Sequence, residues 1–171
     1  MKLRSGIKLL AEIEGYGSPI NDRGRVDAVI KYFRNKGDPL EMVTILQGPE
    51  PYVGEKDGKP CIAWHPPKTH VSHVTYERDM WLARQADLLP GIYYSILGMK
   101  TMGYRHVSIP PHLFGKSLAP SMGLRDDSVI KAEIFVLMIR DHGSAQQGGA
   151  PEPGSNVDPA SPRQPPRPGD R

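Results

Sequence analysis

The stretch of sequence that decides the fold is Met99-Lys-Thr-Met-Gly-Tyr-Arg-His-Val-Ser-Ile-Pro-Pro-His-Leu-Phe114, which Gly115 follows. It begins at the end of an apolar run, and Gly103 predicts a turn. Residues 104–109 then alternate as a strand does, and the two prolines after them cannot continue a ladder of hydrogen bonds. The predicted order is a helix, a turn, a strand and a proline-led loop that ends in an aromatic residue.

Working outward, residues 5–13, 25–34 and 128–139 also alternate between apolar and polar positions, and residues 41–46 predict a further strand. Residues 90–99 instead place Ile92, Ile96 and Met99 at helical spacing. Several of the strands are joined by turns too short for parallel crossovers. We therefore predict an α+β fold, in which a strongly curved antiparallel sheet of about five strands wraps around one short helix, residues 90–99.

Composition bounds the class of protein. The 171 residues are 38% hydrophobic and carry a formal net charge of +3, which suits one domain, residues 1–142, plus some non-globular chain. No basic run is interleaved with aromatic residues, so we expect no nucleic-acid partner. No window reaches the roughly 18 apolar residues of a membrane span, and the N-terminus lacks the apolar core of a secretory signal. We expect a cytoplasmic monomer that binds no membrane.

The tail, residues 143–171, changes composition abruptly. It holds seven of the chain's 18 prolines and no aromatic residue. Such a segment cannot bury enough apolar surface to offset the entropy lost on ordering, so we predict that it is disordered. Its Pro-rich segment, residues 162–168, could be a ligand in the polyproline II form, although a solvated extension is the simpler interpretation.

A long insert, residues 46–73, is predicted between two strands, and long irregular inserts are more often functional or mobile than inert. It contains Cys61, His65, His70 and His73. Their spacing is not that of a known zinc finger, and the prolines at 66 and 67 oppose a helix that would align them. Scattered loop histidines are the alternative, and we expect no metal and no cofactor.

Residues 99–115 contain, in order, Met, Gly, Arg, Val-Ser-Ile-Pro-Pro, an aromatic residue and Gly. This order resembles the FKBP-type peptidyl-prolyl cis-trans isomerases. Residues 5–7 (Ser-Gly-Ile), 15–17 (Gly-Tyr-Gly) and Gly24 fill positions of the same pattern near the N-terminus. Tyr32 matches the tyrosine that lines the family's pocket, and Gly91 matches a glycine of its helix. The resemblance resumes at Tyr76, where residues 76–79 resemble a turn of the family.

Several pocket positions depart from the family pattern. Val74 and Thr75 stand where the family has a Phe-Asp pair, and Ile92 replaces the tryptophan that floors the pocket. Ala132 falls at a strand phenylalanine, and Phe114 at a loop tyrosine, so that a hydroxyl is lost. No Gly-x-Ser-x-Gly or other activated nucleophile is present, which disfavours a hydrolase.

The resemblance implies a peptidyl-prolyl cis-trans isomerase, a folding helper or chaperone that acts on X-Pro bonds of proline-containing polypeptides. An apolar pocket would favour the twisted amide over the planar ground state, with a backbone N–H holding one substrate carbonyl. The alternative is an FKBP-like protein-binding module in which catalysis is weak or lost. By resemblance, the catalytic residues are Tyr32, Leu89 (through its backbone N–H) and Phe114, and the substrate-binding residues are Trp81, Leu88, Ile92, Met122 and Ala132.

Overall fold

The computed structural model describes residues 3–4, 6–40, 49–66, 74–83, 89–114 and 123–140. Seven strands and two short helices occur in this part of the chain. In chain order they are β1 (Lys8–Ile13), β2 (Arg25–Arg34), β3 (Pro51–Lys56), β4 (Lys59–Trp64), β5 (Val74–Trp81), α1 (Pro90–Ile96), β6 (Gly103–Ile109), the 3-10 helix η1 (Pro111–Leu113) and β7 (Ile130–Arg140).

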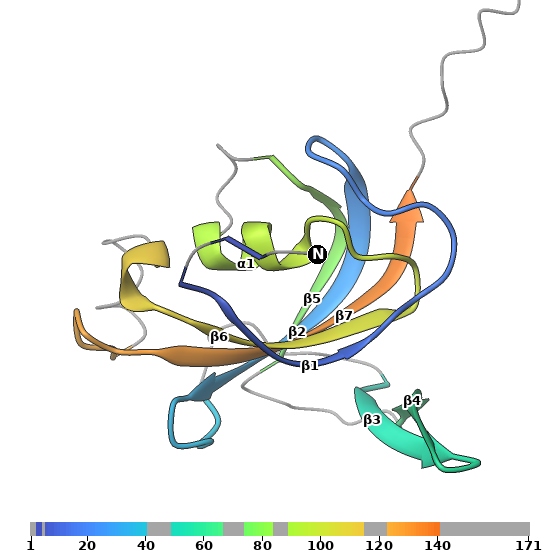
Figure 1. The fold of residues 1–171 in the computed structure, drawn as a ribbon, viewed down its shortest axis with the longest axis horizontal. Helices are drawn as coiled ribbons and strands as arrows, with labels where there is room; N and C mark the ends of the chain where they lie inside the picture. The colour runs from blue at the N-terminus through green and yellow to red at the C-terminus, as the bar shows by residue number, and fades with distance from the viewer. Residues whose placement is uncertain are drawn as a thin grey trace, which may run out of the picture.

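Five of the strands form one antiparallel sheet in the order β1-β6-β7-β2-β5. β2 and β7 lie inside the sheet and pair along their whole lengths, from Arg25 opposite Arg140 to Arg34 opposite Ile130. The sheet curls around α1, which lies on its concave side (Figure 1). The predicted fold class, a curved antiparallel sheet around one short helix, is confirmed.

The main core fills the space between the sheet and α1. Ile92 and Ile96, which the helical spacing selected, are fully buried there. α1 begins with Pro90, whose fixed φ suits the first turn of a helix. It ends at Ile96, three residues before the predicted end, because Gly98 adopts a left-handed conformation with φ 75°.

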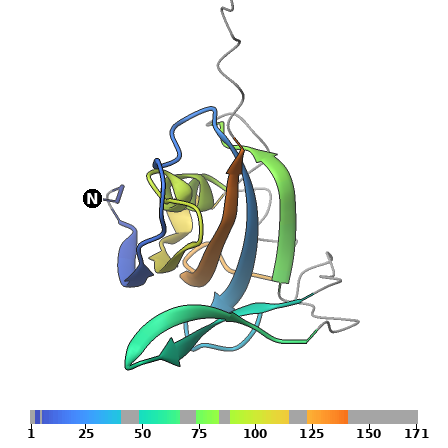
Figure 2. The ribbon, with the colours of Figure 1, turned by 90° about the vertical axis from the view of Figure 1, so that its right-hand side faces the viewer.

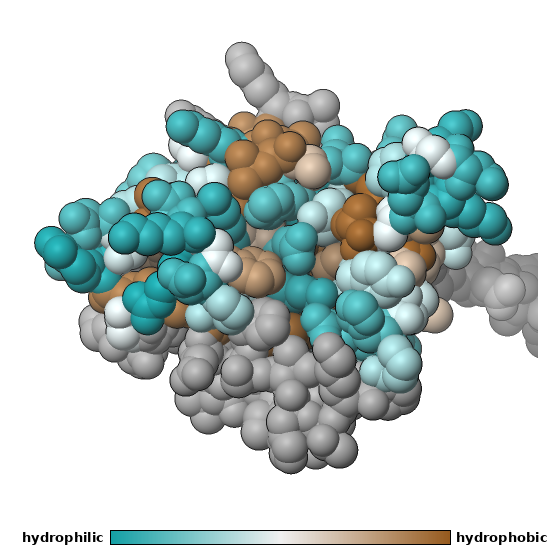
Figure 3. Space-filling model, turned by 90° about the horizontal axis from the view of Figure 1, so that it is seen from below, coloured by the Kyte–Doolittle hydropathy of each residue, from teal (hydrophilic) through white to brown (hydrophobic). Residues whose placement is uncertain are grey.

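The convex face of the sheet carries a second, smaller cluster of buried residues. Val29, Val74, Tyr104 and Phe135 form it, and Ile62 of the β3–β4 hairpin packs against it. The hairpin forms a separate two-stranded sheet that runs beneath the main one (Figure 2). Seen from below, the apolar side chains on this side form separate areas among polar ones (Figure 3).

A buried ion pair joins the hairpin to the main sheet. Lys31 of β2 lies 2.7 Å from the carboxylate of Glu50, which precedes β3, and both side chains are almost completely buried. At the other end of the hairpin, Asp57 and Gly58 have φ of 53° and 72°, the combination that a two-residue type I′ turn requires. The insert is therefore structured over residues 51–64 rather than irregular.

Three predicted strands occur where the sequence placed them, as β1, β2 and β6. The predicted alternation of burial is wrong for β1, which is exposed from Lys8 to Glu12, and for β2, which is buried on both faces from Val26 to Tyr32 because β5 and β7 flank it and the two core clusters cover its faces. In β7, Ile130, Ala132, Ile134 and Val136 share the buried face as predicted, but Met138 is 51% exposed. A register shift between β2 and β7 near Ala28 turns the end of β7 outward.

Two other predictions have different outcomes. The turn predicted at residues 76–79 is wrong, since these residues belong to β5. The strand predicted at residues 41–46 lies outside the described residues, as does the whole of the predicted tail. Neither α1 nor η1 is long enough to cross a membrane, and the described part of the chain has no other helix.

Candidate apolar site at the N-terminal end of α1

The site is built where the start of α1 meets the end of β6. Gly91 lies so close to the strand that a Cβ added to it would be 2.3 Å from Cγ2 of Ile109 and 3.4 Å from the carbonyl oxygen of Leu113. Only glycine permits this approach. The prolines at 110 and 111 then end the strand and start η1, which carries the chain to Phe114.

Five of the predicted site residues belong to the main core, near this end of the sheet. They come from four parts of the chain: β2, the N-terminal end of α1, the segment after η1, and β7. Tyr32 and Ala132 lie directly opposite each other on β2 and β7. All five are less than 9% exposed, and they are Tyr32, Leu89, Ile92, Phe114 and Ala132.

The remaining predicted site residues are not brought to this cluster by the described structure. Trp81 pairs with Arg25, at the opposite end of β2 from Tyr32, and is 51% exposed. Leu88 and Met122 lie outside the described residues. Leu89 is the residue that precedes the first turn of α1. The first N–H groups of a helix have no carbonyl partner within it, so the Leu89 N–H makes no hydrogen bond inside α1.

Tyr32 is the polar residue of the cluster, and it is 5% exposed. Burial raises the pKa of its phenol well above the ordinary value, and the charge of nearby Glu77 acts in the same direction. Tyr32 is therefore a neutral hydroxyl at physiological pH. The cluster is apolar and partly aromatic with one neutral hydroxyl, which suits apolar contacts rather than proton transfer.

Thr75, which the resemblance places at the family's pocket aspartate, is buried beside this cluster. It pairs with Ile30 on β2 and so faces the same concave side as Ile30 and Tyr32. The sequence predicted a turn starting at the next residue, which hid the strand. A signal was present, because the run Val74-Thr75-Tyr76 consists of β-branched and aromatic residues that favour strands.

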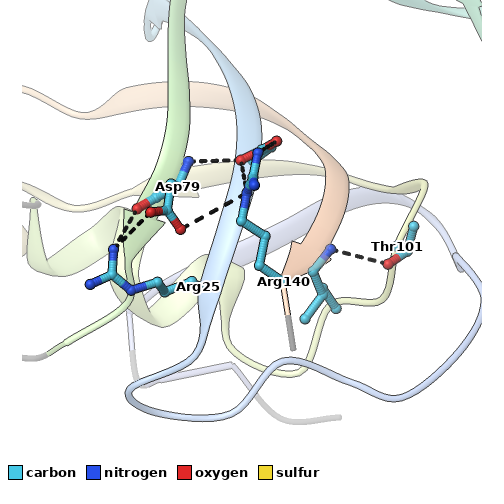
Figure 4. Close-up of polar contacts among 6 residues, drawn as sticks. Arg25, Asp79, Thr101 and Arg140 are labelled. Carbon is cyan, nitrogen blue, oxygen red and sulfur yellow. Dashed lines mark hydrogen bonds and ion pairs between the residues drawn. The ribbon is translucent and has the colours of Figure 1, made fainter. Parts of the chain in front are cut away.

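A network of charged residues lies at the other end of the sheet (Figure 4). Arg140 Nε and Nη2 donate to the two carboxylate oxygens of Asp27 at 2.8 and 2.7 Å, and the backbone N–H of Asp79 donates to the same carboxylate at 2.7 Å. These hydrogen bonds, chiefly those from Arg140, lower the pKa of Asp27 despite its burial. Arg25 pairs with Asp79 at 3.0 Å. This network is structural, since it ties β2, β5 and β7 together.

A pocket of about 360 Å³ opens between the end of β1, the start of β6 and the segment after α1. Its charged side chains neutralise one another, because Lys100 pairs with Glu14 and Arg105 with Glu12. Arg105 Nη1 also donates to the carbonyls of Ser95 and Leu97 at the end of α1. We therefore interpret these charged side chains as stabilising the fold rather than binding a ligand.

The residues considered for zinc are only partly described. Cys61 and His65 lie in and just after β4, and the His65 ring stacks on Tyr52 with the ring centroids 4.1 Å apart. His70 and His73 lie outside the described residues. Among the residues that are described, no three His, Cys, Asp or Glu side chains form a group that could hold a metal ion.

The chain is similar to solved structures, one of which is described here. No protein-family model matches the sequence, and no curated protein sequence matches it. The crystal structure of the three FKBP domains of wheat FKBP73 is 18% identical, with a TM-score of 0.40 over 78% of this chain. This chain spans 45% of that one. A likeness at this level establishes neither membership of the family nor activity.

Proposed function

We propose that this protein is a peptidyl-prolyl cis-trans isomerase that acts on X-Pro bonds of polypeptides and assists their folding. The observation that supports the proposal is that Tyr32, Leu89, Ile92, Phe114 and Ala132 belong to one buried apolar cluster. Sequence motifs of the isomerase pattern supply residues from four separate parts of the chain to this one place. The cytoplasmic location and the monomeric state stay predictions from the sequence.

The chemistry needs no nucleophile and no metal. Rotation about an X-Pro bond is opposed by a barrier of roughly 18 to 20 kcal/mol that arises from amide resonance. The twisted amide has lost this resonance and is less polar than the planar one, so an apolar surface stabilises it relative to the ground state. The Phe114 ring would pack on the proline, while the Tyr32 hydroxyl and the Leu89 N–H would hold carbonyl oxygens of the substrate.

The second candidate is a binding module with little or no catalysis. Three departures favour it: Ile92 in place of a tryptophan, Ala132 in place of a phenylalanine, and Thr75 in place of an aspartate. Each departure removes an aromatic ring or a charged hydrogen-bonding group from the site, while the remaining apolar residues could still bind a proline-containing peptide. The two candidates share a ligand and differ in whether bound peptide isomerises faster.

One experiment tests both candidates. Isomerisation of a Leu-Pro or Phe-Pro peptide is measured with the wild type and with Phe114→Leu, which keeps an apolar side chain but removes the ring. We expect a rate above the uncatalysed one that falls roughly two- to tenfold in the variant, since aromatic contacts contribute about 0.5 to 1.5 kcal/mol. The rate should vary little between about pH 6 and 8, because no group of the described cluster titrates there.

Phe135→Leu is the matched control, because Phe135 is a fully buried phenylalanine on the opposite face of the sheet. It should cost stability and leave the rate unchanged. A binding module would instead show no acceleration in the wild type, and Phe114→Leu would weaken peptide binding. If the wild type neither accelerates isomerisation nor binds a prolyl peptide, both candidate functions are wrong.

A further inference from the structure

The main sheet has two edges, and they differ in how they are protected. β5 forms one edge and β1 the other (Figure 2). An exposed edge can pair with another chain, so native proteins place charged residues in the middle of such strands. β5 follows this rule, because Glu77, Arg78 and Asp79 stand consecutively within it. Asp79 also interrupts the strand with φ 52°. The β5 edge is therefore unsuited to pairing.

The middle of β1 lacks this protection. The strand is exposed from Lys8 to Glu12, and its adjacent leucines, Leu9 and Leu10, are 42% and 46% exposed. Among the described strands β1 pairs with β6 alone, so the backbone groups along its other side have no strand partner. A shift in register after Leu9 leaves Leu10 without an opposite residue on β6. Such a bulge discourages pairing with other chains, whereas two exposed leucines beside unpaired backbone groups favour it.

The charges of β1 are separated by sign along the strand. Lys8 stands at its start, Glu12 near its end and Glu14 just beyond its end. Both carboxylates already have a cation partner within the chain, but their side chains are 41% and 76% exposed. A carboxylate can accept several hydrogen bonds, so each can bind a second cation. Two such strands attract each other when they run antiparallel, because a parallel pair places like charges together.

A two-fold axis between two copies generates an antiparallel pair of identical strands. With the axis between Leu10 and Ala11, the six residues of β1 pair from the first to the last. Lys8 of one copy then lies beside Glu12 and Glu14 of the other. Paired strands are about 4.8 Å apart, a distance that a lysine side chain spans. Apolar side chains meet at the axis, and charged ones meet at both ends of the contact.

We propose that β1 is a self-association surface, through which two copies of this chain pair in antiparallel. The two five-stranded sheets then join into one continuous sheet. Both margins of the joined sheet are β5 strands, which their charges protect from further pairing, so association stops at the dimer. The inference does not depend on the proposed function, and it replaces the monomer expected from the sequence.

Sedimentation velocity of the full chain, from micromolar to near-millimolar concentration, tests the proposal. We expect the wild type to pass from the mass of one chain to that of two as concentration rises. Leu10→Lys should stay monomeric, because it places a charge on each side of the two-fold axis. Tyr76→Lys is the matched control, since Tyr76 is a 38% exposed apolar residue on the opposite edge. It should dimerise as the wild type does. Circular dichroism should show that both variants keep the fold.

Charge reversal tests the register of the two strands. Lys8→Glu and Glu14→Lys should each weaken dimerisation by at least about tenfold, because each puts like charges together at both ends of the contact. A mixture of the two variants should form dimers that contain one copy of each, since the two introduced charges are opposite in sign and meet across the axis. General association through apolar surface would not produce this pairing.

Several results would overturn the proposal. They are a wild type that stays monomeric at every concentration, dimers that survive Leu10→Lys, charge variants that dimerise as well as the wild type, and a mixture of these variants that forms no dimer. Loss of the dimer in Tyr76→Lys would place the contact on another surface and overturn it too. Amide hydrogen exchange gives an independent measurement. Amides of β1 should exchange more slowly in the concentrated wild type than in the dilute one, and those of β5 at an unchanged rate.

Discussion

Gly91→Ala is a substitution whose sign is set by the contact between α1 and β6. In an exposed helix this change stabilises by about 0.8 to 1.0 kcal/mol, because alanine has the higher helix propensity. At position 91, however, the new methyl carbon would lie 2.3 Å from Cγ2 of Ile109. Ile109 is fully buried, and its branched Cβ allows little freedom in χ1, so it cannot turn away.

Overpacking of this kind costs about 1 to 3 kcal/mol, which exceeds the gain in propensity. We therefore expect Gly91→Ala to reduce the free energy of unfolding by about 1 to 2 kcal/mol, measured by urea denaturation followed through tryptophan fluorescence. Prolyl-peptide binding should weaken too. Moving the start of α1 away from the strand separates Leu89 and Ile92 from Phe114.

A double-mutant cycle isolates the contact. Ile109→Leu keeps the volume of the side chain but removes the methyl branch at Cβ, and such swaps usually cost less than about 1.5 kcal/mol. In the Ile109→Leu background, Gly91→Ala should be neutral or stabilising, so the two changes should be strongly coupled. An increase in stability of about 1 kcal/mol for Gly91→Ala in the wild type would refute the reasoning, since it would mean that the helix moves away at no cost.

Three further predictions concern charge and the tail. Asp27→Asn should lower the free energy of unfolding at pH 7 by about 1 to 3 kcal/mol. The folded-state pKa of Asp27 is lowered, so its carboxylate stabilises the fold above its unfolded pKa, and this stabilisation is lost as pH falls. The variant should therefore show a smaller fall in Tm below about pH 4. A wild-type acid profile matched by Asp27→Asn would contradict this. Burial raises the pKa of Tyr32 and Tyr104, so ionising either phenol at high pH destabilises the fold. Tm should stay constant up to about pH 10 and fall above it. The fall should be less steep in Tyr104→Phe. Removing residues 143–171 should change Tm by less than a few degrees, since the segment offers few apolar side chains; a larger drop on calorimetry would show that it docks on the domain.

The elements that the sequence predicted well are those whose two ends are marked by turn residues. β2 was predicted with its observed bounds, because Val26, Ala28, Ile30 and Tyr32 alternate and a Gly-Asp-Pro run follows. β5 was missed for a physical reason. It lies at the edge of the sheet and bulges at Asp79, which has φ 52°, so its pattern of burial is irregular.

The hairpin was missed although it carried a clear signal. Asp57-Gly58 is a strong indication of a type I′ turn, and six residues of strand lie on each side of it. The interpretation as an irregular insert gave more weight to the prolines and to the absence of the family pattern. What the sequence could not indicate is the buried pair of Lys31 and Glu50, because no local pattern links two charges from different elements.

For the candidate site, the sequence indicated which residues are apolar and the resemblance indicated their roles. Tyr32 and Phe114 belong to the same core cluster, although 81 residues separate them along the chain. Trp81 does not join them, because the strand that carries it runs away from the site toward Arg25.

The pairing of β2 with β7 has a consequence for biosynthesis. These neighbours in the sheet are about as far apart along the chain as any two strands of the domain, with Arg25 opposite Arg140. β7 also lies between β2 and β6, so a nascent chain that ends before residue 130 has no strand to join the two parts of the sheet. Because contacts so distant in sequence form slowly, we expect folding on a scale of milliseconds to seconds, completed only once β7 has been synthesised. Until then β2 presents an apolar strand with an unpaired edge, which makes it the segment for a chaperone to protect.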